Sequence, residues 1–585
     1  MSCILPHTFT YEERDEDLGN TVAREKISTE SLIGKTITVD LEYLIHQFTK
    51  GEKRGYEKGY FGEWTSLPKI TYKLKVVGIY YYSKATSLDG GDSILVSKAT
   101  AEKIDKMALD LGVSYDNDKR IASGIKYGLI RSTYNGHACV EKNNLIEFVI
   151  NLLDVNSENV EDGLINLKVK EEIVIETREK SEYIYLYNFY QTEREIAYRI
   201  KKLQESKNIK KILNLNTQLK KAEQISSIEL SEKQREALKL VNENNVSIIT
   251  GGPGTGKTTI IKNIIEIYEE HGKKVILAAP TGRAAKRMTE TTNKEASTLH
   301  RLLEIGKFDE ESFYKNTSDY EGAPIDADII IVDEMSMVDM FLMNYLLKCI
   351  YKGTKLVLVG DVDQLASVGP GSVLKDLINS EQIPTIHLEK IFRQAAKSKI
   401  ILNAHKVNNG ENFLKKDESS EEMKEDFFYI KENNQEQMLA QIVSLCTGRL
   451  EKYGNYDFFQ NIQVLSPTKG MLGTKELNKI LQEKLNPNIN KGPEKASMGA
   501  IFRTGDRVMQ IKNNYDINWE RKLFGEKEIG SGVFNGEIGT ILKVDEKEKQ
   551  IEIKFDDEKI AKYEFSDLDQ IEHSYAITIH KAQRK

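Results

Sequence analysis

The stretch GGPGTGKT, from Gly251 to Thr258, carries the most specific chemical signal in the sequence. A glycine, four further residues, and then glycine, lysine and a hydroxyl residue form a phosphate-binding loop when a strand precedes them and a helix follows. The sequence predicts both, a strand over Val246–Thr250 and a helix over Thr258–Glu270. The alternative, a glycine-rich turn with an exposed lysine, fits this context poorly.

Phosphate binding needs these residue types. Glycines allow a tight backbone whose N–H groups point inward at phosphate oxygens, and the helix N-terminus adds partial positive charge. We expect Lys257 to reach the β- and γ-phosphates of a nucleotide and Thr258 to offer its hydroxyl to Mg²⁺. The predicted nucleotide-binding residues of the loop are Gly251, Gly252, Pro253, Gly254, Thr255, Gly256, Lys257, Thr258 and Thr259.

Two acidic residues follow the apolar run IIIV, which predicts a strand. Ligands bind at the carboxyl ends of strands in open α/β sheets, so Asp333 and Glu334 are candidates for the catalytic part of the same site. Asp333 would hold Mg²⁺ through water, together with Thr258, and Glu334 would orient and deprotonate an attacking water. Solvated acids at a strand end are the alternative, which the phosphate loop upstream disfavours.

A third predicted strand, KLVLVGD, ends close to Gln364. This amide could contact the γ-phosphate and report its presence, so it joins Lys257, Asp333 and Glu334 as a catalytic candidate. The alternative is an ordinary turn, because glycines and a proline interrupt the chain from Gly360 onward.

Bulk properties limit the class of protein. At 585 residues the chain is too long for one core, so three to five domains are expected. The net charge of −7 does not exclude nucleic acid, because binding needs a local basic surface. No apolar run is long enough to span a bilayer, and the first residues lack the features of a signal peptide, so we expect a cytoplasmic protein. The cysteines lie far apart without a CxxC pair, which indicates reduced thiols; they are Cys3, Cys139, Cys349 and Cys446.

The pattern of elements predicts an α/β protein. Residues 1–98 are rich in β signals, and residues 99–225 read as helical with a lysine-rich end. From Ile228 onward, short runs such as VSIIT, KVILAAP and KLVLVGD alternate with helical segments. Runs that are almost wholly apolar suit strands buried on both faces of a parallel sheet. Short strands and turns between Phe502 and Leu568 indicate a small β-barrel.

A series of motifs occurs in one order along the chain. They are GGPGTGKTT, APTGRAAKRM, STLHRLL, IVDEMSMVD, GDVDQLASVGPGSVLKDLI, IFRQA, NAHKVNNG, VLSPTKGMLGTKELN, GDRVMQ, VFNGEIGTI and YAITIHKAQ. Over about Glu229 to Gln583 this order resembles the superfamily one helicases, and within them the RecD-like DNA helicases. The resemblance implies an ATP-dependent DNA helicase that uses ATP and Mg²⁺ and moves 5′ to 3′ on single-stranded DNA.

The resemblance also implies a domain organisation. Two RecA-like P-loop motor domains would occupy residues 226–390 and residues 391–500 with 570–585, the second with an incomplete parallel sheet. An SH3-like β-barrel insert would span residues 501–569. The N-terminal part would comprise a β-rich segment, 1–98, and a helical region, 99–225.

Two further nucleotide contacts come from the resemblance alone. Gln234 in LSEKQREAL matches the glutamine with which the family reads adenine. Its competing role is a capping box, in which Gln234 bonds back to the backbone of Ser231. Arg393 in IFRQA matches the arginine that joins the second motor domain to the nucleotide of the first; its fork of donors suits phosphate. A surface arginine is the alternative.

The family's DNA-contacting segments map onto several parts of the chain. Arg283, Lys286 and Arg287 are spaced to share one helical face, although a solvated basic face is an equal alternative for Lys286 and Arg287, and a core role is open for His300. The predicted DNA-binding residues are Pro280, Thr281, Gly282, Arg283, Thr298, His300, Thr468, Asn535, Gly536 and His580. Lys581 and Gln583 match motifs of the same part. Residues 304–324 match the strand-separating pin, where Phe308 and Phe313 would stack on a base or simply pack.

The sequence departs from the family pattern at both ends. After HKAQ the family continues with a glycine, an acidic residue and a motif that bears a second phosphate-contacting arginine, whereas here Arg584 and Lys585 follow. Loss of such an arginine slows hydrolysis about 10³-fold or more, so we expect a weak or inactive ATPase. Residues 1–98 loosely resemble extracytoplasmic domains of transporter permeases.

The leading hypothesis is therefore an ATP-dependent 5′-to-3′ DNA helicase of repair or recombination. The alternative is a non-catalytic remnant that binds nucleotide and DNA, and a P-loop ATPase acting on protein is a remote third. The resemblance implies single-stranded DNA and duplex with a 5′ single-stranded overhang as substrates. It also implies a monomer without a membrane partner, served by single-stranded-DNA-binding or repair proteins.

Overall fold

The computed structural model describes residues 8–14, 21–28, 36–40, 71–75 and 98–584, with short gaps in the last range. The gaps are residues 111, 134–135, 207–210, 227–228, 306–322, 368, 391, 393–396, 414–425, 468–469, 490–491, 498, 513 and 524–525. The chain divides into two compact units. The first comprises residues 1–127, 150–155 and 308–320, and the second comprises the remainder.

The first unit contains two antiparallel strand pairs and a helix. β1 (Thr8–Arg14) pairs with β2 (Thr21–Ser28), and β3 (Thr36–Asp40) pairs with β4 (Thr71–Lys75). The β signals predicted for residues 1–98 therefore form strands in the described ranges. Helix α2 (Lys98–Asp110) is held by an ion pair from Asp105 Oδ1 to Arg120 Nε at 2.6 Å.

The expected helical region of residues 99–225 also contains a three-stranded antiparallel sheet, in the order β5-β7-β6. Its strands are β5 (Cys139–Glu141), β6 (Ile173–Arg178) and β7 (Ser181–Leu186). The remaining helices are α3 (Asp118–Thr133), α4 (Lys142–Leu153), α5 (Ser157–Val169), α6 (Tyr187–Gln204) and α7 (Leu215–Ser226). The β-branched and aromatic residues of IVIET and EYIYL suit strands, but these short runs lie between helical patterns on either side.

A six-stranded, wholly parallel sheet forms the centre of the second unit, in the order β10-β9-β11-β12-β8-β13. The strands are β8 (Val246–Gly251), β9 (Val275–Ala279), β10 (Ala296–Thr298), β11 (Ile329–Val332), β12 (Lys355–Gly360) and β13 (Thr385–Leu388). The predicted α/β class is confirmed. The strand predicted over Val246–Thr250 is β8, and it lies next to the edge strand β13.

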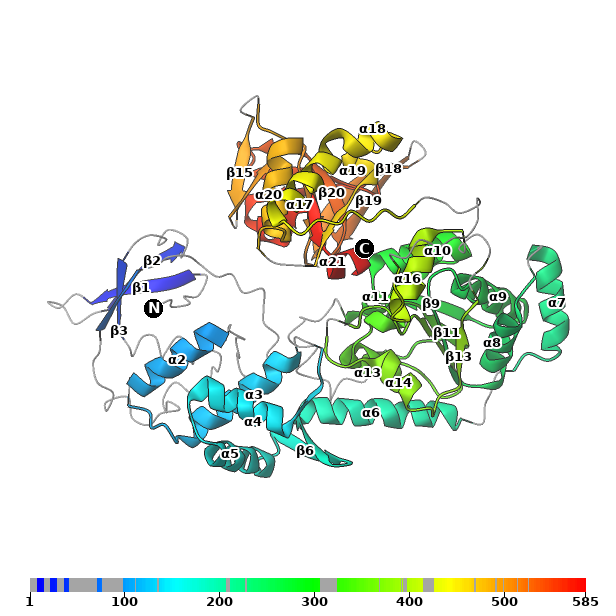
Figure 1. Cartoon of the computed structure of the whole chain (residues 1–585), viewed down its shortest axis with the longest axis horizontal. Coiled ribbons are helices and arrows are strands. Elements are labelled where there is room, and N and C mark those ends of the chain that lie inside the picture. The colour runs from blue at the N-terminus through cyan, green and yellow to red at the C-terminus, as the bar shows by residue number, and fades with distance from the viewer. Residues whose placement is uncertain are drawn as a thin grey trace. The chain divides into compact units, whose positions relative to one another are not determined.

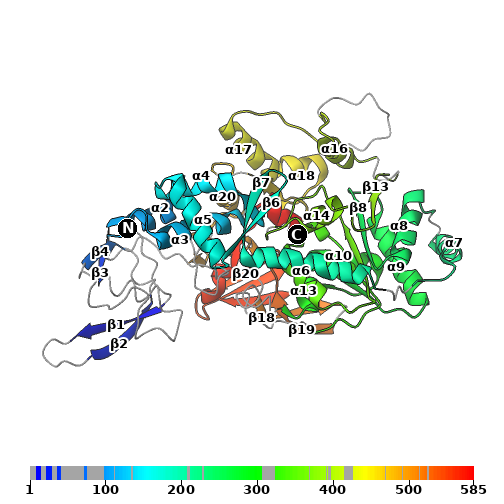
Figure 2. The ribbon, with the colours of Figure 1, turned by 90° about the horizontal axis from the view of Figure 1, so that it is seen from below.

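Helices cover both faces of this sheet, with α8 and α9 on one side and α13 and α14 on the other (Figure 1, Figure 2). Neighbouring strand residues such as Ile248 and Ile249 are both fully buried, as expected when each face is covered. The helices are α8 (Glu232–Glu243), α9 (Lys257–Glu270), α10 (Gly282–Thr292), α11 (Leu299–Leu302), α13 (Met340–Lys348) and α14 (Val373–Asn379). Helix α6 packs on α13, where Phe189 and Phe341 meet edge to face at 5.1 Å.

The part matching the second motor domain contains a parallel pair of strands, β14 (Val464–Ser466) and β24 (Ala576–Thr578). Leu477, Leu481 and Tyr575 are buried in its core. The helices are α16 (Lys399–Asn408), α17 (Gln435–Ser444), α18 (Leu450–Gly454), α19 (Phe458–Asn461), α20 (Thr474–Leu485) and α21 (Ile579–Arg584). A π-helical stretch, Leu445–Arg449, joins α17 to α18.

Between β14 and β24 lies an antiparallel sheet of seven strands, in the order β19-β18-β22-β21-β20-β17-β23. Along β21 every second residue is buried, which is the period of a sheet with one face on a core. The strands are β17 (Arg507–Gln510), β18 (Asn514–Leu523), β19 (Glu526–Val533), β20 (Ile538–Asp545), β21 (Gln550–Phe555), β22 (Ile560–Glu564) and β23 (Ile571–His573). A hairpin of β15 (Glu494–Ser497) and β16 (Ala500–Arg503) precedes them.

Asp506, at the start of this sheet, is fully buried and surrounded by donors. The donors to its carboxylate are Gln482 Nε2 (2.7 Å), Arg503 N (2.8 Å), Asn486 Nδ2 (2.8 Å), Tyr575 Oη (2.9 Å) and His573 Nε2 (3.2 Å). A buried carboxylate with this many donors joins α20, the hairpin and β23 into one structure.

Candidate nucleotide site

The phosphate loop links β8 to α9 at the carboxyl edge of the parallel sheet. Gly256, directly before α9, has a φ of +86°, a left-handed conformation that glycine adopts without steric penalty. The ammonium of Lys257 turns back over the loop and donates to the carbonyl of Gly251 and, at 3.3 Å, to that of Gly252. Thr255 Oγ1 donates to the same Gly252 carbonyl at 2.8 Å. The loop therefore surrounds the lysine that the sequence assigns to phosphate.

Asp333 and Glu334 follow β11 at the same edge of the sheet. Glu334 has a φ of +55°, and its backbone N–H donates to Asp333 Oδ1 at 2.9 Å. Burial raises the pKa of both carboxyls, and each acid's environment includes the charges of Lys257 and Arg287, which oppose the rise. For Glu334, the nearby charge of Asp333 raises the pKa further. The structure thus brings the loop lysine and both predicted acids into one electrostatic neighbourhood.

A third carboxylate, Asp361, was missing from the predicted site. It follows β12, it is 3% exposed, and its charge also raises the pKa of Glu334. The N–H of Gln364 donates to the Asp361 carbonyl at 3.2 Å, so the predicted γ-phosphate sensor lies in the turn that Asp361 begins. The rule that identified Asp333, an acid directly after a buried strand, would also have identified Asp361.

Gln234 forms the capping box that competes with its predicted contact to adenine. Its N–H donates to Ser231 Oγ at 3.3 Å, and its Oε1 accepts from the Ser231 N–H at 2.9 Å. The amide nitrogen points at the phosphate loop and donates to the Gly256 carbonyl at 3.5 Å. Gln234 is therefore both the cap of α8 and a neighbour of the loop, and base recognition stays a prediction.

Two side chains that the sequence did not assign lie against the phosphate loop. A Cβ placed on Gly256 would lie 2.9 Å from the ring of Phe392, and one placed on Gly252 would lie 2.7 Å from Cε1 of His405. Phe392 also donates its N–H to the Gly254 carbonyl at 3.3 Å. Both residues follow β13 in the chain and belong to motifs noted above, IFRQA and NAHKVNNG. Only folding brings them to the loop, so local spacing carried no signal for this contact.

The basic helix expected downstream is α10. Thr281 caps it by accepting from the Ala284 N–H at 3.3 Å, and Arg283, Lys286 and Arg287 are exposed on it, which fits both the predicted DNA contact and a solvated face. The charge of Arg287 lowers the pKa of Asp333 and Glu334, although its side chain is exposed to solvent.

The other predicted DNA contacts lie on separate elements. Thr298 caps α11 by accepting from the Arg301 N–H at 3.1 Å, and His300 is half-buried in that helix. Asn535 is exposed in the turn between β19 and β20, where Gly536 has a φ of +95°. These placements neither join the residues into one surface nor test their role.

Several predictions fall outside the described residues. They concern Arg393, Thr468, Phe308, Phe313 and most of the pin segment 304–324. His580 lies in α21, but its side chain is outside the described part, as is that of Gln583. Lys581 forms an ion pair with Glu572.

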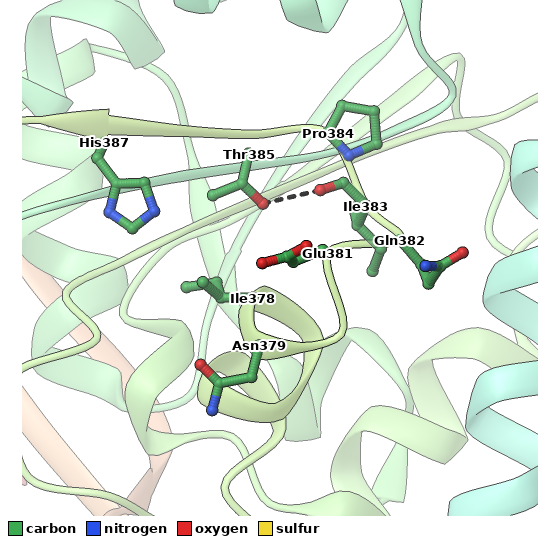
Figure 3. Close-up of a pocket in the computed structure, with 8 residues that line it drawn as sticks. All are labelled: Ile378, Asn379, Glu381, Gln382, Ile383, Pro384, Thr385 and His387. Atoms are coloured by element: carbon green, nitrogen blue, oxygen red, sulfur yellow. Dashed lines mark hydrogen bonds between the residues drawn. The ribbon is translucent and has the colours of Figure 1, made fainter.

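A cavity of about 710 Å³ lies at the opposite end of β13 from the phosphate loop, where Thr385 begins the strand. Figure 3 shows Thr385 Oγ1 donating to the Ile383 carbonyl, at 2.9 Å. The lining residues are Ile378, Asn379, Glu381, Gln382, Ile383, Pro384, Thr385 and His387. None of them belongs to the predicted site.

Within the described residues, no helix is long and apolar enough to cross a membrane.

Comparison with known proteins gives two family matches. Residues 229–424 match the family described as AAA domain, and residues 477–555 match the ATP-dependent RecD-like DNA helicase SH3 domain. The expected barrel insert thus corresponds to an SH3-like domain. The two matches occur in the order in which the motifs predicted the first motor domain and the insert.

Curated relatives agree with these matches. The chain is 35% identical over 357 residues to the ATP-dependent RecD2 DNA helicase of Deinococcus radiodurans, which covers 60% of this chain and 44% of that protein. It is 26% identical over 466 residues to the RecBCD enzyme subunit RecD of Buchnera aphidicola, covering 68% of this chain and 73% of the subunit. The chain thus spans less than half the length of the Deinococcus protein.

Among solved structures, the Pif1 helicase from Candida albicans matches 61% of this chain and 86% of its own, with 18% identity and a TM-score of 0.33. The family models and the curated relatives confirm the resemblance that the motifs indicated.

Proposed function

We propose, from the resemblance of this chain to the RecD-like helicases, that it is an ATP-dependent DNA helicase. The observation that carries the proposal is the meeting of Lys257 with Asp333 and Glu334 at one edge of a parallel sheet. A basic helix, α10, leaves the same edge with its arginines exposed. A site of this kind joins a phosphate-binding loop to an acid pair, and it stands beside a surface suited to a polyanion.

The residues present fit a nucleoside triphosphate with Mg²⁺. The loop offers backbone N–H groups at the N-terminus of α9, together with the Lys257 ammonium. Thr258 and Asp333 supply a hydroxyl and a carboxylate oxygen, the hard ligands that Mg²⁺ takes alongside phosphates. The metal, when bound, would neutralise charge that develops on the phosphates.

Glu334 and Asp333 would have different roles in hydrolysis. Glu334, whose pKa is raised by burial and by Asp333, is suited to take a proton from an attacking water at its carboxylate. Asp333, whose N–H···O contact with Glu334 fixes its position, would face the cation. Lys257 would exchange the carbonyls of Gly251 and Gly252 for phosphate oxygens. Gln364 and Arg393 would report the γ-phosphate to the rest of the motor.

Single-stranded DNA is the proposed strand along which the protein translocates. Thr281, Gly282 and Arg283 at the start of α10 would meet its phosphates, and the Asn535–Gly536 turn and α21 would contribute contacts from the C-terminal part. Movement 5′ to 3′, a preference for a 5′ overhang, a monomeric state, a cytoplasmic location and single-stranded-DNA-binding or repair proteins as partners are parts of the same proposal.

Two assays test the function. Phosphate release from ATP should rise when single-stranded DNA is added and should vanish in Lys257→Ala. A duplex with a 5′ tail should be unwound and one with a 3′ tail should not. Nucleotide binding without any hydrolysis would favour the non-catalytic remnant, and unwinding from a 3′ tail alone would overturn the proposed polarity.

A further inference from the structure

The segment that follows β13 places a histidine over the phosphate loop. His405 lies in α16, and the edge of its imidazole approaches Gly252 so closely that a Cβ on that glycine would lie 2.7 Å from Cε1 and 3.2 Å from Nε2. Gly252 is also the residue whose carbonyl accepts from Lys257 and Thr255. The imidazole and the loop ammonium therefore gather around one residue of the loop.

The Nε2 atom of His405 is buried and makes no hydrogen bond. A buried ring nitrogen without a partner is unfavourable, because it has lost its hydrogen bonds to water without replacement. Histidines buried in a core are normally oriented by a partner on at least one ring nitrogen. An unsatisfied nitrogen next to a phosphate loop is instead poised for a ligand that the loop binds.

We propose that His405 is a further nucleotide-binding residue, whose Nε2–H donates to an oxygen of the terminal phosphate of a nucleoside triphosphate. The imidazole supplies a donor on Nε2 in that neutral tautomer and also when it is protonated. The terminal phosphate is indicated because Lys257, which reaches the β- and γ-phosphates in loops of this type, shares Gly252 with His405. The residue would let α16 respond to whether the γ-phosphate is present.

The inference rests on the proposed function, since it needs a nucleotide in the loop. Its own content is narrower, because it assigns a phosphate contact to α16 and predicts discrimination between triphosphate and diphosphate. Gln364, predicted from its place after a strand, and Arg393, taken from the resemblance, belong to other segments.

Binding of fluorescent N-methylanthraniloyl derivatives of ADP and of a non-hydrolysable ATP analogue tests the assignment. His405→Ala is expected to raise the Kd for the triphosphate about tenfold, the loss of one hydrogen bond to a charged group, and to change the Kd for ADP much less. His405→Gln can place its amide nitrogen near the position of Nε2 and should bind nearly as the wild type does. His405→Asn places its amide near Nδ1 instead and should resemble the alanine variant.

Two controls separate binding from folding. Val407→Ala changes an exposed residue of the same helix, 57% accessible, and should leave both Kd values unchanged. If His405→Ala does not fold, the glutamine and asparagine variants still carry the comparison.

Equal Kd values for wild type and His405→Ala would overturn the inference, as would equal losses for ADP and triphosphate, or a glutamine variant as weak as the asparagine one. Failure of the wild type to bind either nucleotide would instead overturn the proposed function, and the inference with it. Tight binding that Lys257→Ala abolishes and His405→Ala leaves intact would remove only the inference.

Discussion

Two groups of carboxylates in the described residues have opposite surroundings. Asp506, in the C-terminal sheet, is fully buried and receives hydrogen bonds from five donors. Asp333 and Glu334, at the edge of the parallel sheet, are linked by the hydrogen bond from the Glu334 N–H to Asp333 Oδ1, and burial raises the pKa of each. A carboxylate satisfied by the protein stabilises the fold, whereas one left short of donors is available to a cation or a proton.

The largest expected effect is on the acid that is short of donors. Glu334→Gln removes the proposed proton acceptor and should slow ATP hydrolysis about 10²- to 10⁴-fold, with little loss of stability. Phosphate release and thermal unfolding measure the two quantities. Glu381→Gln is the matched control, because Glu381 also has a φ of +55° but is exposed at the opposite end of β13. Normal hydrolysis by Glu334→Gln would place the base elsewhere.

Substitution of Asp506, whose carboxylate is fully hydrogen-bonded, is expected to lower stability. Asp506→Ala leaves five donors without their acceptor, and breaking a buried network of this kind should lower the free energy of unfolding by about 3–5 kcal/mol. Denaturant unfolding measures this change. Glu546→Ala, at an exposed position in the turn between β20 and β21, should unfold as the wild type does. If the two variants were equally stable, the contrast between the carboxylate groups would fail.

The stability of the fold should depend on pH through Asp333 and Glu334. Because the folded-state pKa values of Asp333 and Glu334 are raised, the folded protein binds more protons than the unfolded chain just above the ordinary carboxyl range. These groups therefore reduce stability progressively as pH rises from about 4 through the raised values. The double variant Asp333→Asn, Glu334→Gln should gain stability relative to the wild type over that window. A difference that does not vary with pH in urea unfolding would contradict the raised pKa values.

The smallest expected effect concerns the Gln234 amide, which caps α8 and is also predicted to contact the adenine base. Ser231→Ala and Gln234→Ala each break the capping box of α8 and should each lower stability by about 1 kcal/mol. If Gln234 also contacts the base, only Gln234→Ala should weaken ATP binding, as measured by titration of each variant. Equal ATP affinities for the two variants would leave Gln234 with the cap alone.

Local spacing predicted those parts of the structure that depend on neighbours in sequence. The strand before the loop, the helix after it, the capping box at Ser231 and the basic face of α10 were all read from residues a few positions apart. β6 and β7 were missed, because their short runs of β-branched and aromatic residues lie between two strongly helical patterns. The predictions for Arg393 and Thr468 stay untested by the described residues.

The missing parts of the site share a different cause. Phe392 and His405 follow the phosphate loop by more than 100 residues in the sequence, so no local pattern encodes their contact with it. Asp361 could have been predicted as a site residue, since the sequence places it directly after an apolar strand. Its burial and its effect on Glu334 emerge only when β12 lies beside β8 and β11.

The position of Gln234, which caps α8 and is also predicted to contact adenine, has a consequence for recognition of the nucleotide base. Two-point recognition of adenine by a carboxamide uses both its oxygen and its nitrogen, one for the exocyclic amine and one for N7. Here the oxygen accepts from the Ser231 N–H and the nitrogen donates to the Gly256 carbonyl, so each end of the amide already has one partner. Each end also keeps one free position, because a carboxamide oxygen has two lone pairs and its nitrogen has two hydrogens. A base that bound Gln234 would therefore touch a side chain whose orientation is set by the N-terminus of α8 and by the phosphate loop together.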